Sequence, residues 1–174
     1  LGMPLGAAAA TLEEIHASGC NAGACHAQMY IMGTVLRHGS PEQKQKYLKR
    51  LLAGEAVISV GMTEPEAGSA VTDLRTTATP EAGGYRLNGS KIFTTHSKYA
   101  ELMLVYARFG PGIDGIGSVL VDTKGKGVRF GKPSKFMSDE EWVQTYFEDA
   151  FVPGDMVVLK EGGLHYAYIA NRNE

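Results

Sequence analysis

The stretch YRLNGSKIFTT, residues 85–95, decides the fold, because its apolar and polar residues alternate with the period of a β-strand. At its centre, Asn88-Gly89 is the strongest short-range signal for a hairpin, so the stretch predicts two strands around a turn. Similar strand patterns are AVISVGMT (56–63), ELMLVYAR (101–108), IGSVLVDT (116–123), GVRFG (127–131) and WVQTYFED (142–149). Because no helical pattern separates them, the sequence predicts an antiparallel sheet or barrel, not a nucleotide-binding parallel sheet.

The residues before this region have the spacing of helices. Residues 7–38 carry apolar and small residues at three- and four-residue steps, which predicts a helix that ends at Gly39. A second helix begins at Ser40-Pro41-Glu42-Gln43, with serine as N-cap, proline in the first turn and glutamine three residues after the cap. Gly54 closes this helix. Its predicted buried stripe is Tyr47, Leu48, Leu51 and Leu52.

The sequence therefore predicts an α+β fold, in which a helical segment precedes an antiparallel β-domain and a further helix begins at the end. The predicted units are residues 1–55, 56–158 and 159–174. The chain starts without methionine and stops within a helix-like stretch, so we expect a piece of a longer protein.

The composition favours a soluble globular protein, with 44% apolar and 21% charged residues among 174. A net charge of −2 without a long basic run argues against nucleic-acid binding. No apolar run reaches membrane-spanning length, and the first residues lack the features of a signal peptide. The two cysteines suit a reducing compartment, and we expect a cytoplasmic protein, or one of the mitochondrial matrix in a eukaryote.

Two patterns suggest ligand sites, but their context argues against both. GPGIDG (110–115) has dinucleotide-fingerprint spacing, yet a strand pattern follows it where a helix is needed, so we predict a hairpin loop. His16, Cys20, Cys25 and His26 lack the paired spacing of a metal centre. We expect no metal site, and cysteines buried in a helix interface.

The stretch MTEPEAGSAV, residues 62–71, is the best candidate for a ligand site. Pro65 must end strand pairing, and Gly68 with Ser69 then offers backbone N–H groups and a hydroxyl that suit a phosphate or a ring carbonyl. Phe93 and Thr95, two residues apart on one strand face, suit a flat heterocycle with a polar edge. Taken alone, these residues fit an ordinary turn and a half-buried aromatic side chain better.

MTEPEAGSAV together with LNGSKIFTTH (87–96) resembles the flavin-binding β-domain of the acyl-CoA dehydrogenase family, whose pattern is T-E-P-x-A-G-S-D followed by N-G-x-K-x-[WF]-I-T-N. RHGSPEQKQKYLKRLLAGE upstream and GVRFGKPSKFM with YFEDAFVP downstream agree with this resemblance. The resemblance implies FAD as cofactor. By this resemblance, Met62 and Thr63 contact the pyrimidine edge of the flavin, and Phe93 packs against its ring. Thr94 and Thr95 belong to the same motif, with Thr95 near the reactive nitrogen. Gly68 and Ser69 lie near the diphosphate, and Ser69 also lies near the CoA of the substrate.

The reaction that the resemblance implies is α,β-dehydrogenation of an acyl-CoA thioester, by proton removal at Cα and hydride transfer from Cβ. An electron-transfer flavoprotein is the implied acceptor, and the full-length parent is expected to be a homo-oligomer, a dimer or tetramer. Two alternatives stay open. One is an acyl-CoA oxidase that uses oxygen, and the other is a short subunit or flavin-binding fragment without catalytic activity.

The sequence departs from the family pattern at three places. Ala70 stands where the family has aspartate, His96 stands where asparagine is common, and the segment after KPSKFM is one residue shorter. The C-terminal helical bundle, which holds the catalytic glutamate in most members, is missing. In a minority of members the base lies at the start of that bundle, and Glu174 aligns with this position, as a candidate for the full-length parent only.

Overall fold

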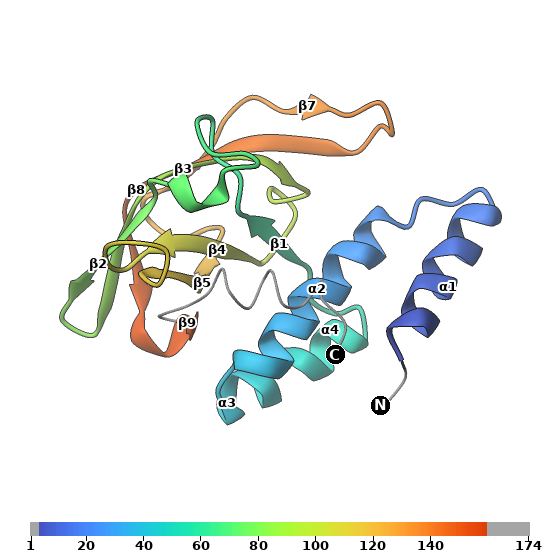
Figure 1. Ribbon diagram of the computed structural model, residues 1–174, viewed down its shortest axis with the longest axis horizontal. Coiled ribbons are helices and arrows are strands. Elements are labelled where there is room, and N and C mark those ends of the chain that lie inside the picture. Colours follow the sequence, from blue (N-terminus) through green and yellow to red (C-terminus); the bar gives the residue numbers. More distant parts are fainter. Residues whose placement is uncertain (1–3, 160–174) are drawn as a thin grey trace.

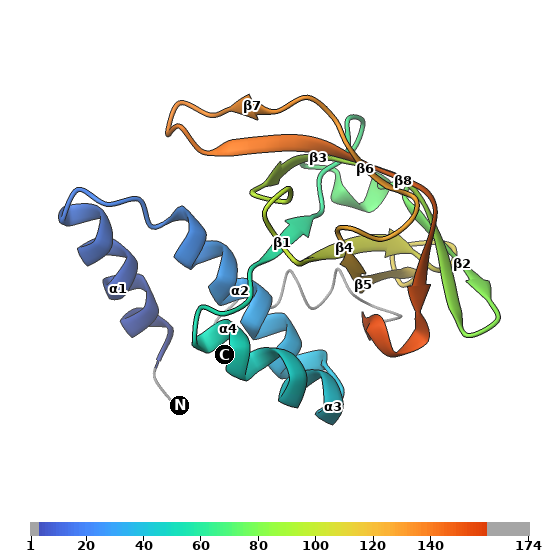
Figure 2. The ribbon, with the colours of Figure 1, turned by 180° about the vertical axis from the view of Figure 1, so that it is seen from behind.

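The computed structural model describes residues 4–159, which form a helical part followed by a curved sheet (Figures 1 and 2). The predicted α+β fold, helices first and then a largely antiparallel sheet, is confirmed. The further helix expected near the end of the chain lies outside the described residues. The helices are α1 (Leu5–Ala17), α2 (Gly23–His38), and a third helix made of α3 (Pro41–Gln43), a π-helical turn (Lys44–Leu48) and α4 (Lys49–Leu52).

The prediction of one helix over residues 7–38 is wrong, because the chain turns between α1 and α2. Gly19 has φ +84°, a left-handed conformation that glycine adopts without steric cost and that ends α1. The amide of Cys20 donates to the carbonyl of Ile15 at 3.2 Å, and the side chain of Asn21 accepts from the amide of Gly23 at 2.7 Å. Helical spacing alone cannot reveal such a break, since both helices keep the same period.

The predicted start of the third helix is confirmed. The Ser40 hydroxyl accepts from the amide of Gln43 at 3.2 Å, and the Gln43 side chain accepts from the amide of Ser40 at 3.0 Å, which completes a capping box. Within the predicted stripe, Tyr47 and Leu51 are buried, whereas Leu52 is 63% exposed. The prediction for Leu52 is wrong because the π-helical turn and the short α4 leave this last residue facing away from the sheet.

Strands of the described region form one sheet in the order β6-β8-β3-β2-β4-β5-β9, with β1 beside β4 and β7 beside β8. Most pairs are antiparallel, but β1 and β2 each pair with β4 in parallel. The G-x-G-x-x-G match joins antiparallel β4 to β5, which confirms the predicted hairpin loop. The strands are β1 (Ile58–Gly61), β2 (Thr77–Glu81), β3 (Gly84–Thr95), β4 (Leu102–Arg108), β5 (Ile116–Asp122), β6 (Val128–Phe130), β7 (Ser134–Lys135), β8 (Glu141–Pro153) and β9 (Val157–Leu159).

The predicted hairpin turn at Asn88-Gly89 is wrong, since β3 runs straight through both residues. The turn lies earlier, between β2 and β3, where Gly83 has φ +81°. Instead of closing its own turn, the Asn88 amide bonds across to Asp149 on β8: its nitrogen donates to the carboxylate and its oxygen accepts from the backbone amide, each at 2.9 Å. The pairing with β8 shifts register between Leu87 and Gly89, where Glu148 and Asp149 of β8 lie opposite Asn88 alone, so the β-bulge is on β8.

Helix α2 and the third helix pack on one side of the sheet, whereas α1 stands away from the strands (Figures 1 and 2). Ile31 of α2 and Tyr47 of the third helix share a buried cluster with Leu104 of β4. A second cluster, which includes Leu87 and Val119, is formed by residues of the sheet strands. Burial of apolar area in the first cluster is the main force that joins the helices to the sheet.

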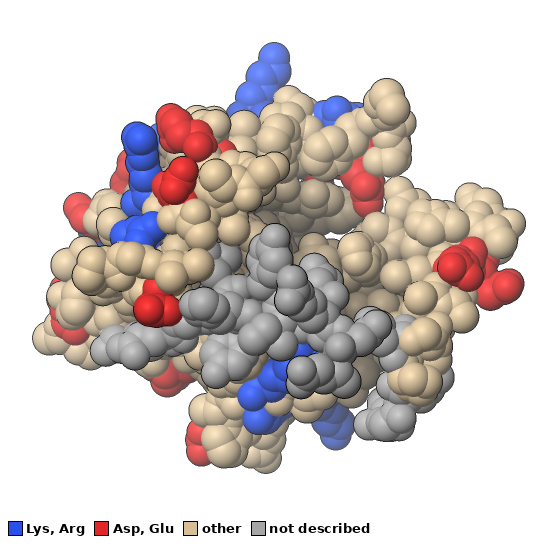
Figure 3. Space-filling model, viewed as in Figure 1, with Lys and Arg blue, Asp and Glu red and all other residues tan. Residues whose placement is uncertain are grey.

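Among the described residues, no helix is both long enough and apolar enough to cross a bilayer. On the face seen in Figure 3, acidic and basic side chains are interspersed over the sheet rather than gathered by sign.

Candidate functional site

The candidate residues meet where the end of β1 crosses β3. The amide of Ile92 donates to the carbonyl of Thr63 at 2.9 Å, so Thr63 lies directly beside β3. The Ser59 hydroxyl of β1 donates to the carbonyl of Thr95 at 2.9 Å. These two bonds bring Met62 and Thr63 next to the strand end that carries Phe93 and Thr95, although about thirty residues separate the segments.

Phe93 is held in an unusual backbone conformation, with φ +57° at a register shift between Lys91 and Thr94. A bulky residue in the left-handed region is strained, and such strain is concentrated at functional sites. Its side chain stays 49% exposed. In a regular strand, successive side chains alternate between the two faces of the sheet. The bulge interrupts this alternation and leaves a large aromatic ring exposed.

The hydroxyls next to Phe93 differ in their availability. The Thr94 hydroxyl is buried and donates to the carbonyl of Val143 at 2.7 Å, with the Thr145 hydroxyl at 2.9 Å. Thr94 could therefore meet a ligand only through its backbone. Thr95 is partly exposed, and the contact of its hydroxyl with the carbonyl of Phe93 is long at 3.5 Å. Thr95 is the side chain that can turn to a ligand.

Gly68 and Ser69 follow a tight turn in which Glu64 and Ala67 exchange two backbone hydrogen bonds of 3.1 Å. Both residues are exposed, and a Cβ placed on Gly68 would meet no atom within 4 Å. The bend therefore has room for a ligand group close to its backbone. That it receives a diphosphate remains a prediction.

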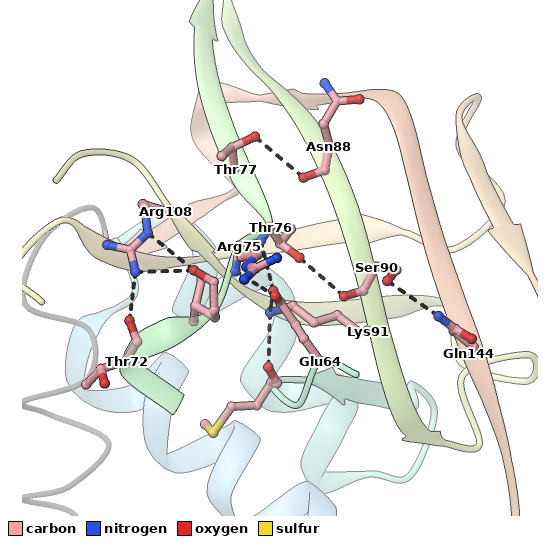
Figure 4. A network of polar contacts seen from close by, with 12 residues as sticks. Glu64, Thr72, Arg75, Thr76, Thr77, Asn88, Ser90, Lys91, Arg108 and Gln144 are labelled. Carbon is pink, nitrogen blue, oxygen red and sulfur yellow. Dashed lines mark hydrogen bonds and ion pairs between the residues drawn. The ribbon is translucent and has the colours of Figure 1, made fainter. Parts of the chain in front are cut away.

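Sequence reasoning missed a buried ion pair beneath this corner, shown in Figure 4. Lys91 Nζ lies 2.8 Å from Glu64 Oε1 and donates to the carbonyl of Met62 at 3.0 Å; the two side chains are 0% and 4% exposed. The Glu64 carboxylate also accepts from the backbone amides of Arg75 at 2.5 Å and Thr76 at 2.9 Å. Strand alternation alone could not show that a lysine faces inward.

Both charges of this pair are perturbed by burial. Loss of solvation lowers the pKa of Lys91 to about 8, although the charge and hydrogen bond of Glu64 act in the opposite direction. Burial alone would raise the pKa of Glu64. The positive charge of Lys91 and the three hydrogen bonds outweigh burial and hold this pKa below its usual value.

Two further aromatic residues were also missed. Trp142 is the cross-strand neighbour of Thr95, and its ring lies 4.7 Å from that of Phe93 in an edge-on arrangement. Phe136 lies 6.1 Å from Phe93 and 5.9 Å from Trp142, measured between ring centroids. The three rings form an aromatic cluster at one edge of the sheet. The strand WVQTYFED was recognised, but only the pairing of β8 with β3 shows what Trp142 faces.

The residues considered for a metal centre do not form one. In the described part of the chain, no group of three or more His, Cys, Asp or Glu residues is placed to hold an ion. The expectation of buried cysteines is wrong, because both are exposed: Cys20 lies in the turn between α1 and α2, and Cys25 lies in the first turn of α2. His16, Cys20 and His26 line an open cavity of about 560 Å³ beside the β7–β8 turn, and no predicted flavin contact lines it. Glu174 lies outside the described residues.

Comparison with known families supports the resemblance over most of the chain. The N-terminal domain of acyl-CoA dehydrogenases matches residues 1–55, and the middle domain of acyl-CoA dehydrogenases matches residues 59–150.

Individual relatives agree. An acyl-CoA dehydrogenase of Mycobacterium tuberculosis is 40% identical over 131 residues, which is 74% of this chain and 34% of the relative. An FAD complex of PigA has 34% identity and a TM-score of 0.71, over 75% of this chain and 35% of that one. A chain from the electron transferring flavoprotein of Acidaminococcus fermentans has 36% identity and a TM-score of 0.74, over 78% and 37%. The chain spans about a third of the length of the curated relatives it matches.

Proposed function

Because the chain belongs to the acyl-CoA dehydrogenase family, we propose that the protein containing it is an FAD-dependent dehydrogenase that acts on acyl-CoA thioesters. The acyl-CoA dehydrogenases among its relatives support an oxidoreductase type, and the activity, the cofactor and the substrate class are our proposal. One observation carries the proposal. Phe93 has a strained backbone and an exposed ring, it lies next to the weakly bonded hydroxyl of Thr95, and both residues lie close to Thr63.

The residues of this corner fit a flavin ring system. Phe93, backed by Trp142 and Phe136, offers an apolar surface for a flat ring, and Thr95 offers a hydroxyl at its edge. The carbonyls of Met62 and Thr63 already accept hydrogen bonds within the protein. We therefore expect their N–H groups and the Thr63 hydroxyl to contact the pyrimidine edge.

FAD, when bound, would accept the hydride that leaves the β-carbon of the substrate. The residues of this chain would orient the cofactor and exclude water from its ring. The exposed bend of Gly68 and Ser69 would hold the diphosphate through backbone N–H groups, and the Ser69 hydroxyl would meet the CoA portion of the substrate.

Glu174 is our proposed candidate for the base that removes the α-proton in the full-length protein. Glu174→Gln should lower turnover at least about a hundredfold, the usual worth of a positioned base, while bound FAD is retained. Rapid-mixing kinetics with an acyl-CoA would measure this change. Unaltered turnover would place the base elsewhere in the protein.

The proposal extends to partners and cell compartment. We propose an electron-transfer flavoprotein as acceptor, supported by the family and by the structural neighbour from A. fermentans. A homo-oligomeric parent, dimer or tetramer, in the cytoplasm or the mitochondrial matrix completes the proposal. Stoichiometric hydrogen peroxide during turnover would instead identify an oxidase.

The experiment uses the protein produced over its complete natural reading frame. It should be yellow as purified, and anaerobic addition of a matching acyl-CoA from a panel of short, branched, aromatic and long thioesters should bleach the flavin absorbance. A colourless protein that takes up no added FAD would end the cofactor proposal. Bound FAD that no acyl-CoA reduces would end the substrate proposal alone.

A further inference from the structure

We infer that the buried pair Lys91–Glu64 is a positioning device that sets the two halves of the proposed flavin site against each other. This inference rests on the proposed function and assigns to it two residues that do not contact the cofactor. One half of the site is the β1 end with Met62 and Thr63, and the other is the β3 end with Phe93 and Thr95.

The ion pair contacts the backbone of the proposed flavin site directly. Lys91 Nζ donates to the carbonyl of Met62 at 3.0 Å as well as binding Glu64 at 2.8 Å. Glu64 directly follows Thr63, and Lys91 stands two residues before Phe93. Between them, the amide of Ile92 donates to the carbonyl of Thr63. A shift of either charged side chain therefore moves a candidate flavin contact.

Glu64 also closes the loop that carries Gly68 and Ser69. Its carboxylate accepts from the amides of Arg75 and Thr76, so residues 64 and 76 are held together at the base of the loop (Figure 4). The Thr76 hydroxyl in turn donates to the carbonyl of Ser90 on β3 at 3.4 Å. One carboxylate thus joins the end of β1, the loop and the strand before Phe93.

An ion pair supplies directed hydrogen bonds, which apolar packing does not. A buried ion pair is a poor device for stability, because desolvation of both charges offsets much of their attraction. This pair, however, has directed bonds to one carbonyl and two amides, and these bonds fix three backbone segments in one arrangement. Such precision matters where a ring must be held within a fraction of an ångström.

The test compares variants of the full-length protein. Lys91→Met combined with Glu64→Gln removes both charges and leaves neither one buried alone. Glu64→Gln by itself is the second variant, and it can fold because Lys91, whose pKa is already lowered, can lose its proton inside the protein. Val119→Ala is the matched control, since Val119 is fully buried in the second core cluster, away from Met62.

We expect both site variants to bind FAD at least about tenfold more weakly and to change the visible circular dichroism of bound flavin, which reports the surroundings of the ring. Val119→Ala should lower the unfolding midpoint without altering either flavin property. If the site variants behave like Val119→Ala, the pair is merely structural and the inference fails while the proposed function stands. If the unmodified protein binds no FAD, both fail together.

Discussion

The left-handed backbone of Phe93 is the residue-scale feature on which the proposed site depends. An L-residue pays about 1 kcal/mol in this region, whereas glycine pays almost nothing. The cost is borne at the single position where an aromatic ring must leave the sheet, which suggests selection for the direction of the ring rather than for stability.

Phe93→Gly should therefore unfold at higher denaturant than Phe93→Ala, by about 1 kcal/mol in the free energy of unfolding, although glycine normally weakens a strand. Phe151 is a matched control, since it is 40% exposed on β8 and is not among the residues with positive φ. At Phe151, the alanine variant should be the more stable one. If the alanine variant is the more stable one at position 93 as well, Phe93 carries no strain.

The buried amine of Lys91 predicts a pH dependence of stability. Its folded pKa of about 8 lies below the value of about 10.4 in an unfolded chain, so folding releases a proton between these pH values. The unfolded state then binds more protons, and the free energy of unfolding rises with pH over that window. Lys91→Met lacks this contribution.

The destabilisation caused by Lys91→Met should thus be larger near about pH 10 than near about pH 7, on top of about 3 kcal/mol from the unpaired Glu64 carboxylate. Denaturant titrations of both proteins at each pH measure the difference, and other lysines and tyrosines cancel in the comparison. A difference that stays constant with pH would mean that Lys91 keeps an ordinary pKa.

At the scale of elements, β3 shows how one strand joins three parts of the sheet. It pairs with β2 and β8, and Gly89, opposite the β8 bulge, lets the segment before β2 pass closely. A Cβ on Gly89 would lie 2.6 Å from the Thr76 hydroxyl oxygen and 2.7 Å from its Cα. A side chain at position 89 would therefore collide with Thr76, which bonds to Ser90 and Glu64.

Gly89→Ala should cost about 2 kcal/mol or more, because φ is +142° and the new methyl group would press on backbone atoms. The same change in a helix gives the opposite sign. Gly33 of α2 has no atom within 4 Å of its Cβ position, so Gly33→Ala should stabilise by about 0.5–1 kcal/mol. Thermal unfolding of both variants tests the pair, and a tolerated alanine at position 89 would contradict the close crossing.

At the scale of the whole molecule, two glutamines join the helices to the sheet. Gln28 of α2 donates to the carbonyl of Ile58 at 3.0 Å and accepts from its amide at 3.3 Å. Gln43 donates to the carbonyls of Asp155 and Val157, at 2.6 and 2.9 Å, while it also completes the helix cap. These side-chain amides thus tie backbone groups of the sheet and of the turn before β9 to the two helices.

Gln43→Ala should lower the free energy of unfolding by about 2 kcal/mol, through loss of the cap and of the two hydrogen bonds to the carbonyls of Asp155 and Val157. Gln45 is the matched control, because it is exposed on the same helix, and Gln45→Ala should stay within about 0.5 kcal/mol. Equal stabilities for the two variants would show that helices and sheet are joined by apolar packing alone.

Local patterns predicted much of this fold. The capping box at Ser40, the loop between β4 and β5 and the change from helices to strands all depend on residues close in sequence, and all are confirmed. The prediction of a turn at Asn88-Gly89 was wrong because the Asn88 side chain makes its hydrogen bond to Asp149, sixty-one residues away, and not within a local turn. The flavin contacts were proposed from motifs, and the positions that carry them stay predictions.

The sequence by itself determined the order of helices before strands, the family and the candidate residues, because periodicity, caps and motifs are short-range properties. Only the tertiary structure decided that Lys91 and Glu64 meet in the interior, that Trp142 stands beside Phe93, and that Thr94 faces inward while Thr95 does not. The physical reason is that pairing register and bulges arise from contacts between distant strands, and a shift of one residue reverses which side chains are buried.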